Sequence, residues 1–154
     1  MGRILKIAGI GLIVLLIILQ FFRPELNNEP TDPELDLISL AAPPEALARV
    51  LRNACYDCHS DQTNYPWYQK LSPVSWYLNR HIKKGKADLN FSEYGRLDKA
   101  DRIGLLVKTC EAVEAGTMPL QSYRLMHKEA RLTTDVRDAL CDWTGEEALK
   151  VMRE

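Results

Sequence analysis

The sequence lacks a strong net charge of either sign. Its 154 residues include 20 basic and 21 acidic ones, which gives a formal net charge of −1 at pH 7. Proteins that bind nucleic acid carry a strongly basic balance or a clustered basic face, so this charge argues against a nucleic-acid partner. Internal repeats, low-complexity tracts and alternating runs of β-branched residues are also absent from residues 45–154. Because such alternating runs are the signal of strands, the sequence predicts helices there.

One long apolar run is present, at the N-terminus. Residues 7–19 contain no polar or charged side chain, and Lys6 and Arg23 flank them. About 16 helical residues at ~1.5 Å each span roughly 24 Å, somewhat less than a ~30 Å bilayer core, which flanking basic side chains can compensate by reaching the interfaces. Small residues, which a signal-cleavage site requires, are missing around residues 20–24. We expect residues 1–22 to be an uncleaved membrane anchor; a cleaved signal peptide or a buried core helix are the alternatives.

Charge divides the rest of the chain. Arg3 and Lys6 precede the apolar run, whereas residues 23–44 hold five acidic residues, five prolines and a single base. The positive-inside rule then places the N-terminus in the cytoplasm and the remainder outside it. Repeated proline with acid predicts an extended, self-repelling tether for residues 23–44. Residues 45–154 suffice for one modest core, so we expect a single-pass inner-membrane protein with this domain in the periplasm.

Four helices are predicted in the domain from apolar periodicity and end signals. Ser72 and Pro73 begin the second helix and Gly85 ends it, whereas Gly116 ends the third. The predicted helices cover residues 44–56, 73–85, 99–115 and 133–152, with Gly145 as a candidate break in the last and a loop with a helical turn at 123–127 before it. Their predicted inward residues are Leu47, Val50, Leu51 and Ala54; Val74, Tyr77, Leu78, His81 and Ile82; Ile103, Leu106, Val107, Cys110 and Val113; and Val136, Leu140 and Trp143.

Residues 55–59 read Cys-Tyr-Asp-Cys-His, which is the attachment motif for c-type haem. Two cysteines at this spacing can bond the two vinyl groups along one porphyrin edge, and the adjacent histidine then places its imidazole beneath the iron. The sequence therefore predicts Cys55 and Cys58 as thioether sites, and His59 as the proximal iron ligand of one covalently bound haem c.

The motif has three other interpretations. A structural zinc site needs four ligands, usually including a second Cys/His pair, but Cys110, Cys141, His81 and His127 are scattered and unpaired. A thioredoxin-like redox pair expects a βαβ context, which a helical domain does not offer. A chance match or a local disulfide is the third alternative. Haem attachment is favoured over all three.

The second axial ligand is best supplied by Met118. Pro119 biases Met118 toward an extended backbone, on a loop that follows the helix-ending Gly116. Such a loop can present the thioether on the side of the iron opposite His59. The alternatives are His81, His127, Met126 or an open sixth position.

The chain resembles the bacterial haem-binding domain family of small, membrane-anchored, c-type cytochrome-like proteins. The resemblance covers roughly residues 45–145 and lies in four segments: "CYDCHSDQTNYPWY", "SPVSWYLNRHIKKGKADLNFSEY", "GTMPLQSYRLMHKEARLT" and "CDW". It implies an all-α, cytochrome c-like fold around one haem. It also implies Cys55 and Cys58 as attachment sites, His59 as proximal ligand and Met118 as distal ligand. Cys110 and Cys141 are not part of the family pattern, and the resemblance supplies no physiological role.

Several side chains outside the motif have two interpretations each. Cys110 and Cys141 either pair as a disulfide in an oxidising compartment, or Cys110 is buried as a small apolar residue. A basic cluster either holds haem propionates and steers an acidic redox partner, or is a solvated helix face. A set of aromatic residues near the motif lines the haem pocket or fills the core. The basic cluster is Arg80, Lys83, Lys84 and Lys86, and the aromatic set is Trp67, Tyr68, Trp76, Tyr77 and Phe91.

These observations predict an electron carrier and not an enzyme. It would exchange single electrons with redox partner proteins in the membrane or periplasm. A haem-based sensor or enzyme with an open sixth iron site is the main alternative, although no acid–base pair near a distal pocket is visible in the sequence. A structural zinc module is the third hypothesis.

Overall fold

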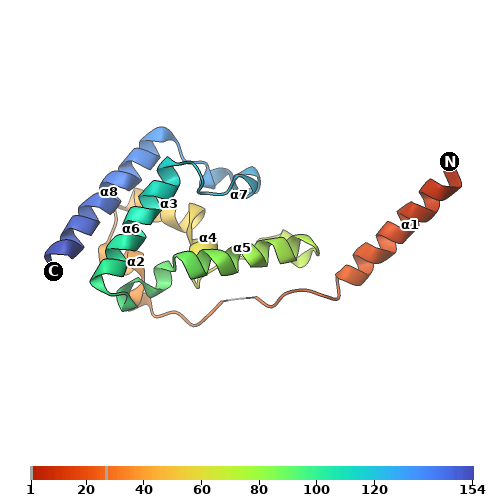
Figure 1. Ribbon diagram of the computed structural model, residues 1–154, viewed down its shortest axis with the longest axis horizontal. Helices are drawn as coiled ribbons and strands as arrows, with labels where there is room; N and C mark the ends of the chain where they lie inside the picture. Colours follow the sequence, from red (N-terminus) through yellow and green to blue (C-terminus); the bar gives the residue numbers. More distant parts are fainter. Residues whose placement is uncertain (1, 27) are drawn as a thin grey trace.

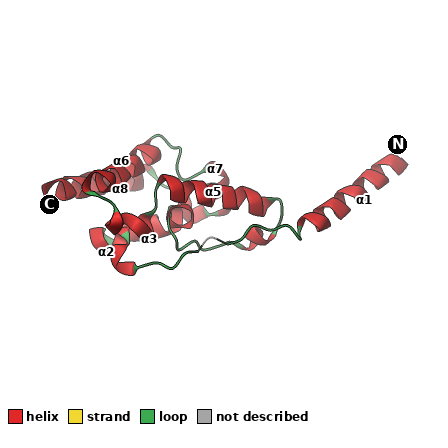
Figure 2. Cartoon of the chain, turned by 60° about the horizontal axis from the view of Figure 1, so that its bottom comes forward, coloured by secondary structure: helices red, strands yellow, loops and turns green. Residues whose placement is uncertain are grey.

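The computed structural model describes residues 2–26 and 28–154, and every regular element within these residues is a helix. Figure 2 shows these helices joined by loops, without a strand. The all-helical prediction is therefore confirmed. The α-helices are α1 (Gly2–Leu19), α2 (Leu37–Ala41), α3 (Glu45–Ala54), α4 (Tyr56–His59), α5 (Val74–Asp88), α6 (Lys99–Glu114), α7 (Gln121–Met126) and α8 (Thr134–Arg153). The short 3-10 helices are η1 (Pro33–Leu35), η2 (Trp67–Lys70), η3 (Phe91–Arg96) and η4 (Lys128–Ala130).

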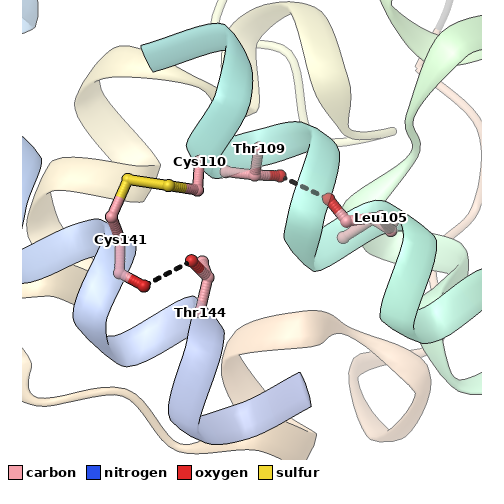
Figure 3. The surroundings of a disulfide bond; sticks show 5 residues. All are labelled: Leu105, Thr109, Cys110, Cys141 and Thr144. Carbon is pink, nitrogen blue, oxygen red and sulfur yellow. Dashed lines mark hydrogen bonds between the residues drawn. A yellow bond between two sulfur atoms is a disulfide. The ribbon is translucent and has the colours of Figure 1, made fainter. Parts of the chain in front are cut away.

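Helices α6 and α8 pack side by side, whereas α5 points out of the domain toward α1 (Figure 1). A disulfide joins the first pair: Cys110 on α6 and Cys141 on α8 lie 4.9 Å apart between Cα atoms (Figure 3). Of the two interpretations of these cysteines, the disulfide is the one found in the structure. Beside the disulfide, Thr109 and Thr144 each donate a hydrogen bond to a backbone carbonyl of their own helix.

The core lies where α2, α3, α4, η3, α6 and α8 meet. Its apolar side chains come from all six elements, so residues distant in sequence are buried together. The most fully buried of them include Leu37, Leu51, Phe91, Tyr94, Leu106 and Leu140.

Helix α1 stands apart from this core. None of its residues is buried, and its mean hydropathy is 2.4. Its length and composition suit a membrane span, a property that a signal sequence shares.

The structure differs from the expected tether over the second half of residues 23–44. There Asp36 caps α2 by accepting a hydrogen bond from the Ile38 amide, and Leu37 is only 1% exposed. Tyr56 donates a 2.8 Å hydrogen bond to the buried Asp36 carboxylate. Residues 36–41 therefore belong to the packed domain, because their apolar turn has a core to enter.

Two of the three glycines predicted to end or break a helix lie within helices. Gly116 does end α6, with a φ of 66° that favours glycine. Helix α5, however, continues through Gly85, and α8 continues through Gly145 to Arg153. Downstream residues such as Val151 are buried, which keeps α8 intact past its glycine.

Of the predicted apolar stripe of α5, Ile82 is buried as expected, whereas Val74 and Tyr77 are exposed. The other buried residues of this helix are Ser75, Asn79 and Gly85. Most of the predicted stripe instead lines an apolar cavity, described below. Similarly, Val107 on α6 is 44% exposed, and its neighbour Leu105 takes the inward place.

Candidate functional site

The cysteine–histidine motif forms a tight turn at the end of α3. Helix α3 ends at Ala54, and the carbonyl of Cys55 accepts hydrogen bonds from the amides of Cys58 (3.1 Å) and His59 (2.9 Å). Between the cysteines, Tyr56 turns into the core, where its ring centroid lies 5.5 Å from that of Phe91. Because Tyr56 is packed in the core, the two cysteines and His59 lie at the edge of the core, beside a set of cavities.

Three neighbouring cavities of about 190, 500 and 340 Å³ share lining residues, and we call them together the crevice. His59 and Met118 both line the first and second cavities. Cys55 lines the second, whereas Cys58 lines the first and third. The structure thus brings all four predicted site residues to one space, of a size that ligand pockets commonly have (~300–1,000 Å³).

His59 is oriented by the backbone that follows α5. Its Nδ1 lies 3.1 Å from the carbonyl oxygen of Leu89, so Nδ1 carries the proton and donates. Burial lowers the pKa of His59, which favours the neutral imidazole. Nε2 then carries a lone pair, and a backbone carbonyl on the other nitrogen is the usual outer support of a metal-binding histidine.

Cys55 and Cys58 are free thiols. Burial raises the pKa of Cys55 to about 12 and that of Cys58 to about 11, so both stay protonated at neutral pH. A redox-active pair needs a low thiol pKa, and a zinc site needs thiolates with further donors nearby. Among the described residues, the sole grouping of three or more such donors is Cys110, Glu114 and Cys141, whose cysteines form the disulfide.

Gly85 fixes the motif against α5. A Cβ atom at this position would overlap the carbonyl oxygen of Cys58 and lie 3.1 Å from the carbonyl carbon. Only glycine allows the helix to approach the motif so closely. The sequence marked Gly85 as a helix end, whereas its role is this contact.

Met118 is held by the end of α6. The carbonyl of Ala112 accepts hydrogen bonds from the amides of Thr117 and Met118, each at 3.1 Å, and from the Thr117 hydroxyl at 3.0 Å. Gly116 makes the reversal possible through its positive φ. Met118 itself is half-buried in the wall of the crevice.

The alternative iron ligands are placed less favourably. Both ring nitrogens of His127 have partners: Nε2 lies 2.8 Å from the Tyr68 hydroxyl, and Nδ1 lies 3.4 Å from Glu129. His81 lines the crevice, and its Nδ1 is hydrogen-bonded to the Tyr77 carbonyl of its own helix. Met126 lines the third cavity but is 57% exposed.

Tyr123 and Asp57 form a contact that sequence reasoning missed. The Tyr123 hydroxyl donates a 2.6 Å hydrogen bond to the Asp57 carboxylate, which also accepts one from the Asn64 amide. This contact ties α7, next to Met118, to the middle of the cysteine motif. No motif or periodicity in the sequence marks Tyr123, because the contact depends on how α7 folds back.

The basic cluster does not act as one group. Lys86 pairs with the buried Asp61 at 3.0 Å and is therefore structural. Arg80, Lys83 and Lys84 are exposed, and Lys84 also lines the crevice. Of the aromatic set, Phe91 fills the core and lines the second cavity, whereas Trp67, Tyr68 and Tyr77 line the third.

Comparison with known proteins agrees with this geometry. A family model described as a haem-binding domain matches residues 14–146. No curated protein and no solved structure was found to match the chain. The residues present fit a haem: a histidine whose Nδ1 is held by a backbone carbonyl and a methionine share an apolar crevice with two free thiols. The resemblance drawn from the sequence is therefore confirmed, and the chain belongs to the haem-binding domain family.

Proposed function

We propose that this protein is a membrane-anchored c-type cytochrome that carries single electrons. The observation that carries the proposal is the shared crevice of His59, Met118 and the two free thiols. Cys55 and Cys58 would hold the haem by thioether bonds, in which each S–H adds across one vinyl group without gain or loss of electrons. His59 and Met118 would supply the two axial ligands.

The chain's own residues suit electron transfer. Haem held this way supplies one-electron exchange between ferric and ferrous iron. The Leu89 carbonyl holds the His59 ring in place, and a methionine ligand raises the reduction potential. The largely aromatic and aliphatic walls of the third cavity give the site apolar surroundings. The positive charges of the exposed Arg80, Lys83 and Lys84 would attract an acidic redox partner.

The anchor and the disulfide support an exported domain. In this proposal α1 spans the inner membrane, with Arg3 and Lys6 on the cytoplasmic side and the domain in the periplasm. Disulfides such as Cys110–Cys141 persist in oxidising compartments, and the periplasm is one. Anchoring also raises the local concentration of the domain at the membrane surface, where partners embedded in the membrane lie.

Visible spectra of the full chain, expressed with export and haem attachment, test the proposal. We expect a low-spin spectrum, with the weak far-red band of an iron–sulfur bond in the ferric form. Met118→Leu abolishes that band, whereas Met126→Leu and the control Met152→Leu retain it. A high-spin spectrum that is unchanged by Met118→Leu, with immediate carbon monoxide binding, would instead identify an open sixth site and favour the sensor or enzyme alternative.

A further inference from the structure

The chain that leaves α1 is clamped to the start of α5. The side-chain amide of Gln20 bonds both backbone groups of Ser72: its Nε2 donates to the Ser72 carbonyl at 2.9 Å, and its Oε1 accepts from the Ser72 amide at 3.1 Å. Trp76 donates from Nε1 to the carbonyl of Phe22 at 2.6 Å. Figure 1 shows the N-terminal end of α5 directed toward α1. The domain is therefore held at this point by several hydrogen bonds as well as by the chain.

An apolar surface lies at this clamp. Trp67 on η2 is 69% exposed, and Leu71, Val74 and Trp76 that follow it are 44%, 43% and 40% exposed. We call Trp67, Leu71 and Val74, which together line the third cavity, the apolar face. Phe22, at the end of the anchor, adds a further exposed ring. Contiguous exposed apolar surface of this kind marks an interaction site.

The composition of this surface suits a lipid headgroup region. Residues 65–78 contain no acidic residue and one base, Lys70. Tryptophan places an apolar ring and a polar N–H at the two sides of such an interface, and lysine pairs with anionic lipid headgroups. A redox partner steered by charge would instead meet the basic cluster farther along α5.

We propose that the apolar face docks on the bilayer that α1 spans, at the level of the headgroups. This inference rests on the proposed membrane anchor. The short chain between α1 and the apolar face identifies the bilayer as the surface that this face contacts. Helix α1 ends at Leu19, and the next residue, Gln20, is hydrogen-bonded to Ser72. One residue reaches at most ~3.6 Å, so the start of α5 lies where α1 leaves the membrane. A second copy of the chain has no comparable constraint.

Docking of this face orients the crevice. The third cavity, which reaches Cys58, is also lined by Trp67, Leu71 and Val74 of the apolar face. One edge of the crevice therefore opens at the membrane surface, and the bilayer covers apolar walls that the domain leaves exposed.

Depth measurement by a nitroxide label tests this docking. The haem-loaded full chain would carry a label at Leu71→Cys or Trp67→Cys, with Leu149→Cys on α8, 50% exposed, as the matched control. The chains are placed singly in nanodiscs of phosphatidylethanolamine and phosphatidylglycerol, which removes any second copy. The haem is reduced with dithionite before labelling, and the excess reductant, which would also reduce the nitroxide, is removed. Collision rates with oxygen and with a water-soluble nickel chelate are then measured by power saturation. Two label positions keep the test independent of one variant that misfolds.

We expect nickel collisions at 67 and 71 to be about fivefold rarer than at 149, and oxygen collisions to be more frequent, as for side chains ~5–10 Å into the headgroup boundary. Equal nickel collisions at all three positions would overturn the docking. Failure of the chain to enter nanodiscs would overturn the anchor and the docking with it. Absence of the haem spectrum from the unlabelled chain would instead count against the proposed function, so the failures are distinguishable.

Discussion

Gly85 lies against Cys58 with no room for a side chain between α5 and the cysteine motif. A Cβ at Gly85 would overlap the Cys58 carbonyl oxygen and come within 3.3 Å of the Cys58 Cβ. The position of the motif is therefore set by a helix that begins beside the hydrogen bonds of Gln20 to Ser72 and ends where Leu89 orients His59. One helix thus connects the proposed anchor to the proposed iron ligand.

Gly85→Ala is expected to destabilise the domain. The added methyl meets backbone, which cannot move as a flexible side chain does, so the free energy of unfolding should fall by about 1–3 kcal/mol. Gly104→Ala in α6 is the matched control, because nothing lies within 4 Å of its Cβ position. The control should be neutral or stabilising by up to about 1 kcal/mol. Urea unfolding followed by circular dichroism measures both; equal effects would contradict the close contact.

Tyr123→Phe is expected to loosen the motif from α7. It removes the 2.6 Å hydrogen bond to Asp57, and bonds to charged groups contribute about 1.5–3 kcal/mol. Tyr77→Phe is its control, since the Tyr77 hydroxyl bonds Ser122 at an exposed site and its loss should change stability by less than about 0.5 kcal/mol. The urea midpoints of the two variants measure their loss of stability. A smaller loss of stability for Tyr123→Phe than for Tyr77→Phe would contradict a role of Tyr123 in holding the motif.

Local signals in the sequence identify the candidate site residues but not the contacts that support them. Cys55, Cys58 and His59 follow from a fixed spacing within one turn, and Met118 follows from a glycine and a proline beside it. Gly85 was misread as a helix end because the sequence does not show which glycines face another backbone. The same limit hid Tyr123, whose partner is 66 residues away.

The composition of residues 23–44 also gave a wrong prediction for their second half, because the many prolines and acids there mask a short apolar turn. Prolines and acids predicted a tether through residue 44, yet Leu37 enters the core and Asp36 meets Tyr56. On α5, periodicity identified an apolar stripe correctly but not its destination. Periodicity alone cannot distinguish a stripe that packs on the core from one that lines a crevice.

The two thiols should react slowly in the chain before haem is attached. With a pKa of about 11 for Cys58 and about 12 for Cys55, the thiolate fraction at pH 8 is about 100-fold or more below that of an ordinary thiol. Alkylation by iodoacetamide should accelerate by a similar factor when the same chain is unfolded in urea. Reaction at equal rates in the two states would contradict burial of the thiols.

The same raised pKa values predict the pH dependence of the haem-free fold. Folding favours the protonated thiols, so this contribution to stability is complete below the ordinary thiol pKa of 9.0. It is lost as pH rises from there through about 11 to 12. The urea concentration at the unfolding midpoint of the haem-free chain should therefore decrease as the pH is raised from 8 to 11. The decrease should be smaller in a Cys55→Ala/Cys58→Ala variant. An identical fall in the two proteins would assign the effect to other groups.

Removal of the disulfide should lower stability without changing the haem spectrum. Cys110 and Cys141 are 31 residues apart, and closing a loop of that length is worth roughly 3–4 kcal/mol through the entropy of the unfolded chain. The Cys110→Ser/Cys141→Ser variant should therefore unfold at lower urea concentration. Its visible spectrum in the absence of urea serves as the control, and an altered iron ligation would contradict a purely structural role for the pair.

The intact mass of the purified full chain under denaturing conditions tests covalent haem attachment most directly. After expression with export and haem attachment, the account predicts a mass greater by one haem, which survives acid and organic solvent. The Cys55→Ser/Cys58→Ser variant should lack that increment, whereas the Cys110→Ser/Cys141→Ser variant should keep it. A wild-type chain of unmodified mass, with any haem extracted into the solvent, would contradict the account.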